Sequence, residues 1–162
     1  MKIYTIGVYD FEEEQFFQAL QDAGVELFCD LRWRRGLRGA KYAFANYKRL
    51  YARLESMGVA YLHRRDLAPT PEIRARQKEA DEAKGVAKRK RGELSPAFIR
   101  AYREEILSGF DPQTFLDALP AGTNRVALFC VEREPEACHR SLVAAKLASL
   151  PTVEVEHLLP PV

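Results

Sequence analysis

The sequence predicts an α/β protein with a three-layer α/β/α, Rossmann-like architecture and a mainly parallel central sheet. Short apolar runs of strand length alternate along the chain with longer segments whose apolar residues recur at helical spacing. Glycine, proline and helix-capping residues separate the two kinds of segment. Such alternation favours parallel strands joined by crossovers, with helices packed on both faces of the sheet.

The N-terminal part of the chain supplies three predicted strands and two predicted helices. The strands are Lys2–Ile6, residues 25–29 and residues 59–62, each a short apolar or β-rich run. Asp10 is a suitable cap for the first helix, because three glutamates follow it in the first turn and favour the helix dipole. The second helix is expected over residues 47–57, between a glycine-containing loop at 32–45 and Gly58.

The C-terminal part begins with a polar stretch and ends with a strand, a helix and a last strand. Residues 72–91 are rich in helix formers but almost lack an apolar face, which is typical of an exposed helix or a mobile insertion. Ser95-Pro96 and Asp111-Pro112 are helix starts, with proline at the first helical position. Residues 125–131 form an almost unbroken apolar run, as in strands buried on both faces. A helix over 139–150 and a strand over 152–155 follow.

Length and composition indicate one domain over residues 1–162, with a polar insertion at 72–94. The 162 residues are 47% apolar, so the chain can bury a core without a disulfide or structural metal. The chain has three cysteines, and this small, odd number argues against a disulfide framework. It favours a reducing compartment and a cytoplasmic location. The longest apolar run, residues 126–131, is too short to span a bilayer, so no membrane role is expected. The sequence does not indicate the oligomeric state.

Positive charge is concentrated in two segments although the net charge is only +2. Residues 32–53 hold eight basic side chains and no acidic one, and residues 84–91 hold five basic side chains and no acidic one. Such runs attract phosphate groups or nucleic acid, or they simply solvate a surface. The candidate nucleic-acid contacts are Arg34, Arg35, Arg38 and Lys41.

The candidate site lies at the carboxyl ends of the predicted strands, where ligands bind in open parallel sheets. One strand ends in Asp30 and Arg32, and another leads to Glu132. The helix that follows begins near Cys138, and its first turn offers unpaired N–H groups to an anion. A cysteine at such a position can become a reactive thiolate.

Each candidate has a role in the predicted site. Arg32 and Arg140 are expected to bind an anion, with Asp30 orienting Arg32. Cys138 is the candidate nucleophile, and Glu132 and His139 are the acid–base candidates. The same groups have structural interpretations: a buried thiol at a helix start, and a Glu132–Arg140 ion pair that fixes a loop.

A metal or cofactor is not expected. Cys130, Cys138, His139 and His157 are chemically suited to zinc. However, the chain has no C-x-x-C or H-x-x-x-H spacing, and adjacent residues on a helix, as Cys138 and His139 would be, point in different directions. Cys130 and Cys29 lie in apolar strands, where packing in the core is the simpler interpretation. His63 is open to either a site role or a structural role.

The combination of motifs resembles the family numbered 488 among the domains of unknown function. The motifs are Thr5-Ile6-Gly7, Asp30-Leu31-Arg32, Phe44 with Asn46, the run from Gly58 to His63, Cys130-Val131-Glu132 and Cys138-His139-Arg140. The resemblance extends from Lys2 to His157, and its most specific part is C-x-E followed by C-H-R. Family members often carry His-Ser after the glycine, where this chain has Val8 and Tyr9. The resemblance implies a fold and a site but no reaction, and a looser likeness to rhodanese-type sulfurtransferases is one of fold alone.

Three functional interpretations follow. The first is a protein that binds or acts on nucleic acid or another phosphate-bearing ligand, because basic and aromatic residues are interleaved over 32–53. The second is a thiol-dependent small-molecule enzyme with Cys138 as nucleophile. The third is a non-catalytic scaffold or regulator in which Cys138, His139 and Arg140 are structural.

Overall fold

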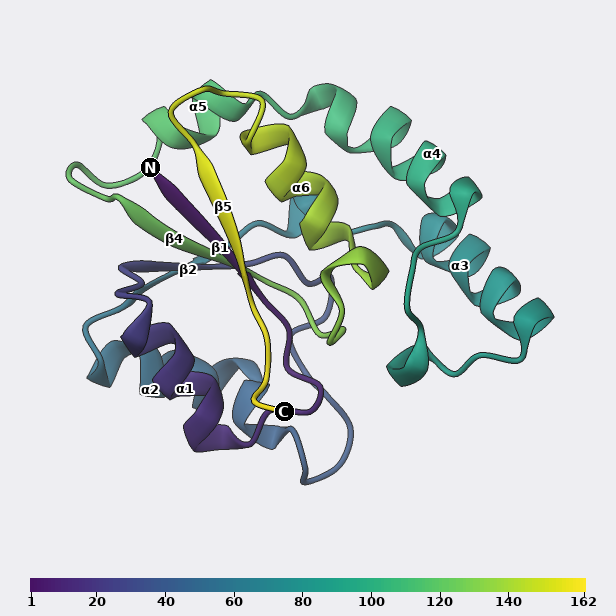
Figure 1. The fold of residues 1–162 in the computed structure, drawn as a ribbon, viewed down its shortest axis with the longest axis horizontal. Coiled ribbons are helices and arrows are strands. Elements are labelled where there is room, and N and C mark those ends of the chain that lie inside the picture. The colour runs from purple at the N-terminus through teal and green to yellow at the C-terminus, as the bar shows by residue number, and fades with distance from the viewer.

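The computed structural model, which describes residues 1–88 and 90–162, contains a five-stranded sheet with every strand parallel (Figure 1). The order of the strands is β3-β2-β4-β1-β5. Their bounds are Lys2–Ile6 for β1, Leu27–Asp30 for β2, Ala60–His63 for β3, Arg125–Phe129 for β4 and Glu154–Leu158 for β5. The predicted α/β class and parallel sheet are therefore confirmed.

Strand β4 occupies the centre of the sheet, as its composition requires. Residues 126–129 are completely buried, and β4 pairs with β2 on one side and β1 on the other. Side chains of a strand alternate between the two faces of a sheet. An apolar run without alternation therefore fits only a strand that is covered on both faces.

Six α-helices accompany the sheet in the described residues. Their bounds are Glu13–Asp22 for α1, Tyr47–Ser56 for α2, Pro71–Lys84 for α3, Pro96–Glu105 for α4, Pro112–Asp117 for α5 and His139–Leu147 for α6. Three of them begin with proline directly after a capping side chain: Thr70, Ser95 and Asp111 each accept a hydrogen bond from a backbone N–H three residues later. These starts can be read from the sequence because they depend only on local residues.

The helices form two layers that cover opposite faces of the sheet (Figure 1). Helices α1 and α2 pack through Phe16, Leu20 and Leu50 onto one face, together with Phe28 and Phe129 of the sheet. Helices α4, α5 and α6 pack on the other face in a second apolar cluster. This arrangement confirms the predicted three-layer fold.

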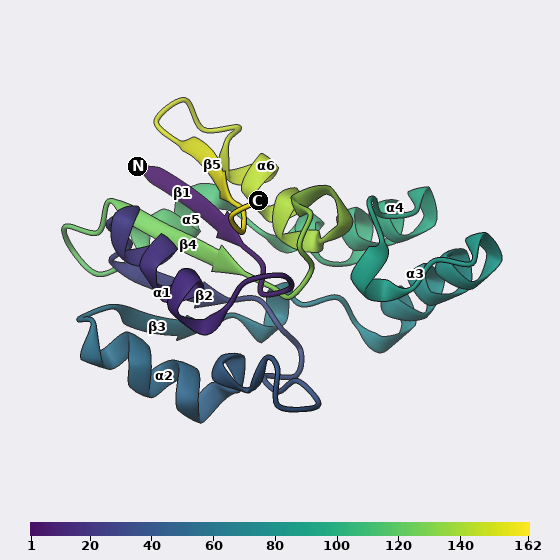
Figure 2. The ribbon, with the colours of Figure 1, turned by 60° about the horizontal axis from the view of Figure 1, so that its bottom comes forward.

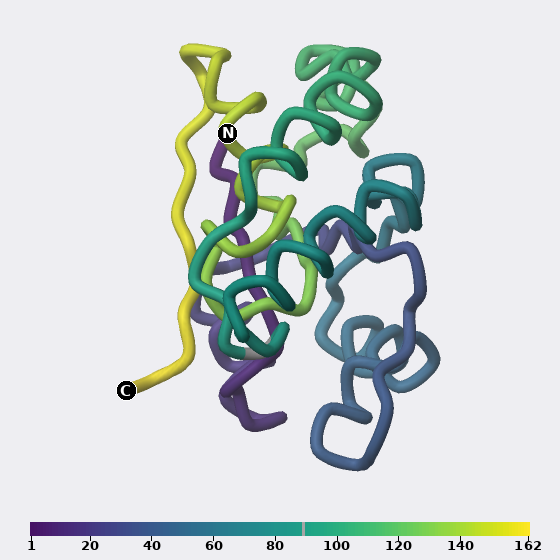
Figure 3. Tube along the Cα trace, turned by 90° about the vertical axis from the view of Figure 1, so that its right-hand side faces the viewer, coloured from purple at the N-terminus to yellow at the C-terminus, as the bar shows by residue number. Residues whose placement is uncertain are grey.

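Helices α3 and α4 form an arm, residues 71–88 and 90–105, that projects beyond the carboxyl ends of the strands (Figure 2). Figure 3, which looks from that side, shows both helices in front of the sheet. Ile73 and Gln77 are the buried side chains of α3, and Gln77 Oε1 accepts a hydrogen bond from Ser95 N at 2.8 Å. Of the two alternatives for the polar stretch at 72–91, the structure shows a helix for its first part, up to Lys84.

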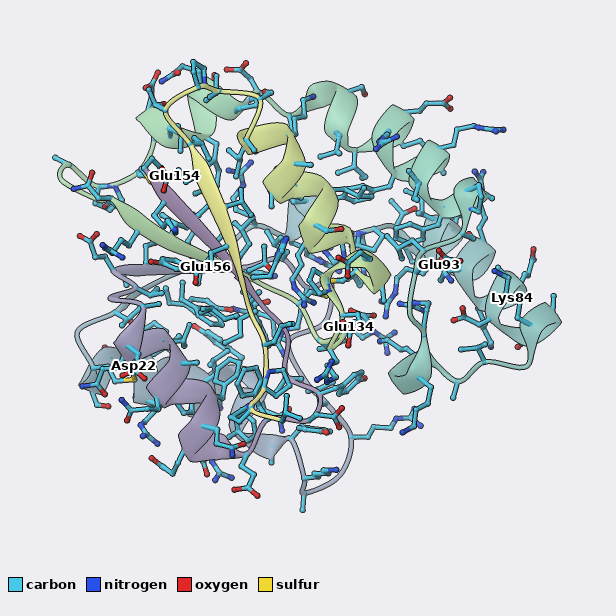
Figure 4. All side chains as sticks on the ribbon, viewed as in Figure 1. Asp22, Lys84, Glu93, Glu134, Glu154 and Glu156 are labelled. Atoms are coloured by element: carbon cyan, nitrogen blue, oxygen red, sulfur yellow. The ribbon has the colours of Figure 1, made fainter. Side chains whose placement is uncertain are left out.

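The far end of the arm is polar. Lys84 and Glu93 are labelled there in Figure 4, and their charged groups are 3.9 Å apart. Both side chains are exposed, so this ion pair adds little stability. The arm is instead held by buried apolar side chains, which are Ile73 in α3 and Phe98 and Tyr102 in α4.

Several predicted boundaries shift, and two of the shifts have a clear cause. Asp10 does not cap α1, because its φ of 70° places it in the left-handed region and its N–H donates to the Tyr42 hydroxyl. Glu12 is the cap, and its N–H donates to Gln15. The last strand begins at Glu154 rather than at residue 152, because its length is set by pairing with β1, so His157 lies within the strand and not after it.

The other changes are small. Strands β2 and β3 start one or two residues later than predicted, β4 ends at Phe129, and α6 ends at Leu147. Cys130 and Val131 therefore lie just beyond β4. Among the described residues, no helix combines the length and apolarity needed to cross a bilayer.

Candidate functional site

The carboxyl ends of β2 and β4 face a cleft of about 850 Å³ whose opposite wall is the arm. Arg32 follows β2, and Cys130 and Glu132 follow β4, and all three line the cleft. Cys138 and His139, at the start of α6, line it as well. Four of these five residues were predicted for the site, whereas packing in the core was the simpler interpretation of Cys130, and all five share one cavity, as the position of strand ends in a parallel sheet requires.

Two thiols and an imidazole form a tight cluster in this cleft. The Sγ atoms of Cys130 and Cys138 and a ring nitrogen of His139 all lie within 4.8 Å of one another. The expectation that Cys138 and His139 point apart is wrong, because Cys138 precedes the helix with extended backbone angles of −137° and 143°. Two thiols and an imidazole are the donor set that thiophilic metal ions use.

Cys138 and His139 have the geometry of a thiol and its base. Cys138 Sγ is 3.8 Å from His139 Nδ1, and His139 Nε2 donates to the Leu31 carbonyl oxygen at 3.0 Å. Because a carbonyl oxygen can only accept, the proton of the neutral ring is on Nε2 and the lone pair of Nδ1 faces the thiol. The loop after β2 therefore sets the tautomer of the histidine.

The local charges favour a thiolate at Cys138. Burial by itself raises the pKa of this thiol, but a hydrogen bond from Cys130 and the charges of His139 and Arg140 outweigh burial and hold the pKa well below its usual range. The pKa of Cys130 is raised well above normal, first by the same hydrogen bond and then by burial. Burial lowers the pKa of His139, yet the neighbouring Cys138 leaves it raised overall.

Glu132 is a buried carboxylate with one free oxygen. Its Oε1 accepts from Arg91 Nη2 at 2.8 Å and lies 3.8 Å from Lys88 Nζ, whereas Oε2 is buried without a partner in the described structure. Burial, followed by the charge of Cys138, raises the pKa of Glu132. Arg91 and Lys88 come from the basic run at 84–91, for which the sequence indicated an attraction for phosphate or a solvated surface but no contact with Glu132.

Asp30 and Arg32 form a buried ion pair. Arg32 donates from Nε to Oδ1 at 2.9 Å and from Nη2 to Oδ2 at 2.8 Å, as predicted for a carboxylate that orients a guanidinium. Tyr61, which the sequence did not single out, also donates to Asp30 Oδ2 at 2.7 Å. Arg32 Nη1 is buried with no partner in the described residues, so the fork that faces the cleft keeps a free donor.

Arg140 lies behind the cleft rather than in its lining. Its side chain is completely buried, and it donates from Nη1 to the Glu132 carbonyl at 2.6 Å and from Nη2 to the Arg133 carbonyl at 3.1 Å. Gly7 permits this contact, because a Cβ there would lie 1.9 Å from the Glu132 carbonyl oxygen and 3.2 Å from Arg140 Nη1. Arg140 therefore stabilises the loop that carries Glu132 by hydrogen bonds to two of its backbone carbonyls.

The four candidate nucleic-acid contacts divide into two pairs. Arg34 and Arg38 line the cleft. Arg35 instead lies over the Tyr47 ring, 3.7 Å from its centroid, and Lys41 lies 5.4 Å from the centroid of Tyr42. The basic segment is therefore split between the cleft and the surface near α2.

The remaining histidines lie outside the thiol cluster. His63 Nε2 is 2.8 Å from the Arg32 carbonyl oxygen, which gives it a structural contact beside the site. His157 Nδ1 is 2.6 Å from Thr5 Oγ1 on the neighbouring strand. Neither histidine lines the cleft.

Comparisons with known proteins give one family and no characterised relative. The profile of the family described as "Domain of unknown function DUF488" matches residues 12–147. This range contains the Asp30, Cys130 and Cys138 motifs but not Gly7. A search of curated proteins and a search of solved structures each found no match. Because the profile covers most of the 162 residues, the chain belongs to the DUF488 family.

Proposed function

We propose that the protein is a cysteine-dependent enzyme acting on an anionic small molecule, with Cys138 as nucleophile, His139 as base and Arg32 as the anion-binding residue. The observation that carries the proposal is the placement of Cys138 Sγ 3.8 Å from His139 Nδ1 on the wall of a basic cleft. A nucleophile, a base and a group that orients the base are the three parts of covalent catalysis by thiols.

The chemistry is a transfer or hydrolysis through a covalent intermediate. The Cys138 sulfur forms a bond to an electrophilic centre of the substrate while the bond to the leaving group breaks. His139 Nδ1 takes the thiol proton and returns it to the leaving group. Water then attacks the intermediate, releases the sulfur and gives its proton to His139. The Leu31 carbonyl stabilises the imidazolium formed in each step.

The charge of the cleft supports an anionic substrate. In the described residues its lining carries seven basic side chains, histidine aside, and three acidic ones. Arg32 Nη1 is the best-placed donor, because Asp30 fixes the guanidinium and leaves that nitrogen without a partner. Phosphate, sulfate and carboxylate groups each match an arginine fork.

Glu132, which lines the same cleft, also supports the proposal. Burial, followed by the charge of Cys138, raises the pKa of the Glu132 carboxyl, which favours a role for this group in proton transfer. Its free Oε2 can hydrogen-bond a hydroxyl or amine of the substrate, whereas Oε1 is held by Arg91. We assign Arg140 a positioning role, because both of its terminal nitrogens hold the loop of Glu132.

The test is competitive alkylation of the three cysteines. Limiting iodoacetamide at neutral pH, followed by mass analysis of the peptides, should label Cys138 before Cys29 and Cys130. Inorganic phosphate should slow the labelling of Cys138, and Arg32→Lys should weaken that protection without abolishing the labelling. A rate for Cys138 no faster than that of a thiol in a short unfolded peptide would contradict the proposal.

A second candidate is nucleic-acid binding in the same cleft. It is favoured by Arg34 and Arg38 on one wall and Arg74 and Lys78 on the arm. Binding through phosphates weakens steeply with salt, so a titration of a short single-stranded oligonucleotide with NaCl measures it. Arg34→Ala and Lys78→Ala should each reduce the salt dependence by about one ion. Absence of binding at low ionic strength would remove this candidate.

A further inference from the structure

We infer that Cys130, Cys138 and His139 form a binding site for one thiophilic divalent cation, for which zinc is the best match, and that its occupation silences Cys138. The consequence for Cys138 rests on the proposed function, whereas the binding site itself does not. The sequence predicted no metal, because it placed Cys138 and His139 on diverging faces of a helix. The extended backbone of Cys138 removes that objection.

The donor atoms lie close to the separations that a zinc site requires. Zn–S and Zn–N bonds of about 2.3 and 2.0 Å at tetrahedral angles separate two donor atoms by roughly 3.5–3.8 Å. Cys138 Sγ and His139 Nδ1 are 3.8 Å apart, and all three donor atoms lie within 4.8 Å of one another. Only small side-chain movements are therefore needed to bring the three donors onto one ion.

The histidine is oriented as a metal ligand is. His139 Nε2 donates to the Leu31 carbonyl, and this contact leaves the Nδ1 lone pair facing the two thiols. Metal-bound histidines almost always donate their second ring N–H to a carbonyl, a carboxylate or water, which fixes the ring and raises its basicity. The hydrogen bond from His139 Nε2 to the Leu31 carbonyl is a contact of this kind.

Charge and access also suit a divalent ion. Coordination needs both sulfurs as thiolates and His139 Nδ1 without a proton, so the two protons of the cysteine pair are released to solvent and the two thiolates neutralise the ion. The three donors line the cleft, which leaves a fourth position open to that side. Glu132 lines the same cleft, and its Oε2 is buried and unpartnered among the described residues.

Occupation of this site is incompatible with nucleophilic catalysis. The ion takes the sulfur lone pair of Cys138 that would attack a substrate, and it takes the Nδ1 lone pair of His139 that would accept a proton. Zinc would therefore act as a reversible inhibitor, removed by a chelator. The same coordination would protect the buried thiol pair from alkylating reagents.

Cobalt(II) titration under anaerobic conditions tests the site directly. Cobalt bound by thiolates gives a sulfur-to-cobalt charge-transfer absorption, and a tetrahedral site gives intense visible bands. We expect both signals to saturate at one equivalent and zinc to displace the cobalt. Cys130→Ala should weaken binding about 100-fold or more and diminish the charge-transfer band.

Cys29→Ala is the matched control, because Cys29 is a completely buried thiol on β2 outside the cluster. Its cobalt spectrum and affinity should equal those of the natural protein. Equal spectra for Cys130→Ala and Cys29→Ala, or no charge-transfer band at stoichiometric cobalt, would overturn the inference.

Alkylation separates failure of the inference from failure of the proposed function. Rapid labelling of Cys138 in metal-free protein that zinc blocks supports both. Rapid labelling without cobalt or zinc binding overturns the metal site and leaves the proposed function standing. Metal binding to a protein whose Cys138 is unreactive even after chelation supports the site and overturns the proposed nucleophile.

Discussion

Replacement of Gly7 by alanine should disrupt the contact that joins the end of β1 to the loop of Glu132. A Cβ at this position would lie 1.9 Å from the Glu132 carbonyl oxygen and 2.8 Å from its carbon. An ordinary contact needs about 3.5 Å, so one backbone segment must move by roughly 1.5 Å. Such a movement also breaks the hydrogen bond that Arg140 donates to the same carbonyl at 2.6 Å.

The expected cost of Gly7→Ala is large for a single added methyl group. Overpacking a filled site costs about 1–3 kcal/mol. A lost hydrogen bond to a charged group adds about 1.5–3 kcal/mol. The free energy of unfolding should therefore fall by roughly 2.5–6 kcal/mol, which for a chain of this length corresponds to a drop in Tm of about 5–24 °C.

Urea denaturation followed by circular dichroism measures this change. Gly109→Ala is the matched control, because Gly109 has no positive φ and an added Cβ there would meet nothing within 4 Å. The control should stay within about 0.5 kcal/mol of the natural protein. If Gly7→Ala and Gly109→Ala have the same free energy of unfolding, the contact between Gly7 and the Glu132 loop does not contribute to stability in this way.

Three further predictions use side chains with measurable partners. Arg91→Met should destabilise the protein by about 1.5–3 kcal/mol in urea, because buried Glu132 and partly buried Asp81 each lose a charged hydrogen bond and keep weaker contacts with Lys88 and Gln77. Exposed Arg103→Met should have little effect. Tyr102→Phe should cost about 1 kcal/mol in the same assay, since its buried hydroxyl donates to a backbone carbonyl, and exposed Tyr51→Phe should cost nothing. Partial burial, and then Arg140, lower the pKa of His157, so the unfolded chain binds the extra proton and stability falls as pH drops through about 6.5. His157→Gln should flatten that part of the stability profile, and an unchanged slope would contradict it.

The fold was predictable to the extent that its determinants are local. The unbroken apolar run of β4 and the Ser95-Pro96 helix start are set by neighbouring residues, and both predictions were confirmed. The start of α1 was mispredicted because the left-handed backbone of Asp10 depends on a hydrogen bond to Tyr42, 32 residues away. No local pattern contains that information.

The sequence indicated several residues of the candidate site but not the contacts that these residues make. Topology places Arg32, Glu132 and Cys138 around one cleft, as expected from the strand ends. The sequence does not distinguish Arg32, which lines the cleft, from Arg140, which is enclosed by backbone carbonyls. That difference depends on how closely two loops approach. Arg91, 41 residues from Glu132, stood out only as one member of a charged run.

The two walls of the cleft come from separate stretches of chain. On one wall, Cys138, His139 and Arg32 lie at or near the carboxyl ends of the strands. On the other wall, Arg74 and Lys78 belong to α3, whose buried side chains are Ile73 and Gln77. Substitution of exposed α3 side chains would change which molecules fit into the cleft and would leave Cys138 and His139 unchanged. Under the proposed function, substrate preference and chemical reactivity therefore depend on different segments and can be engineered as independent traits.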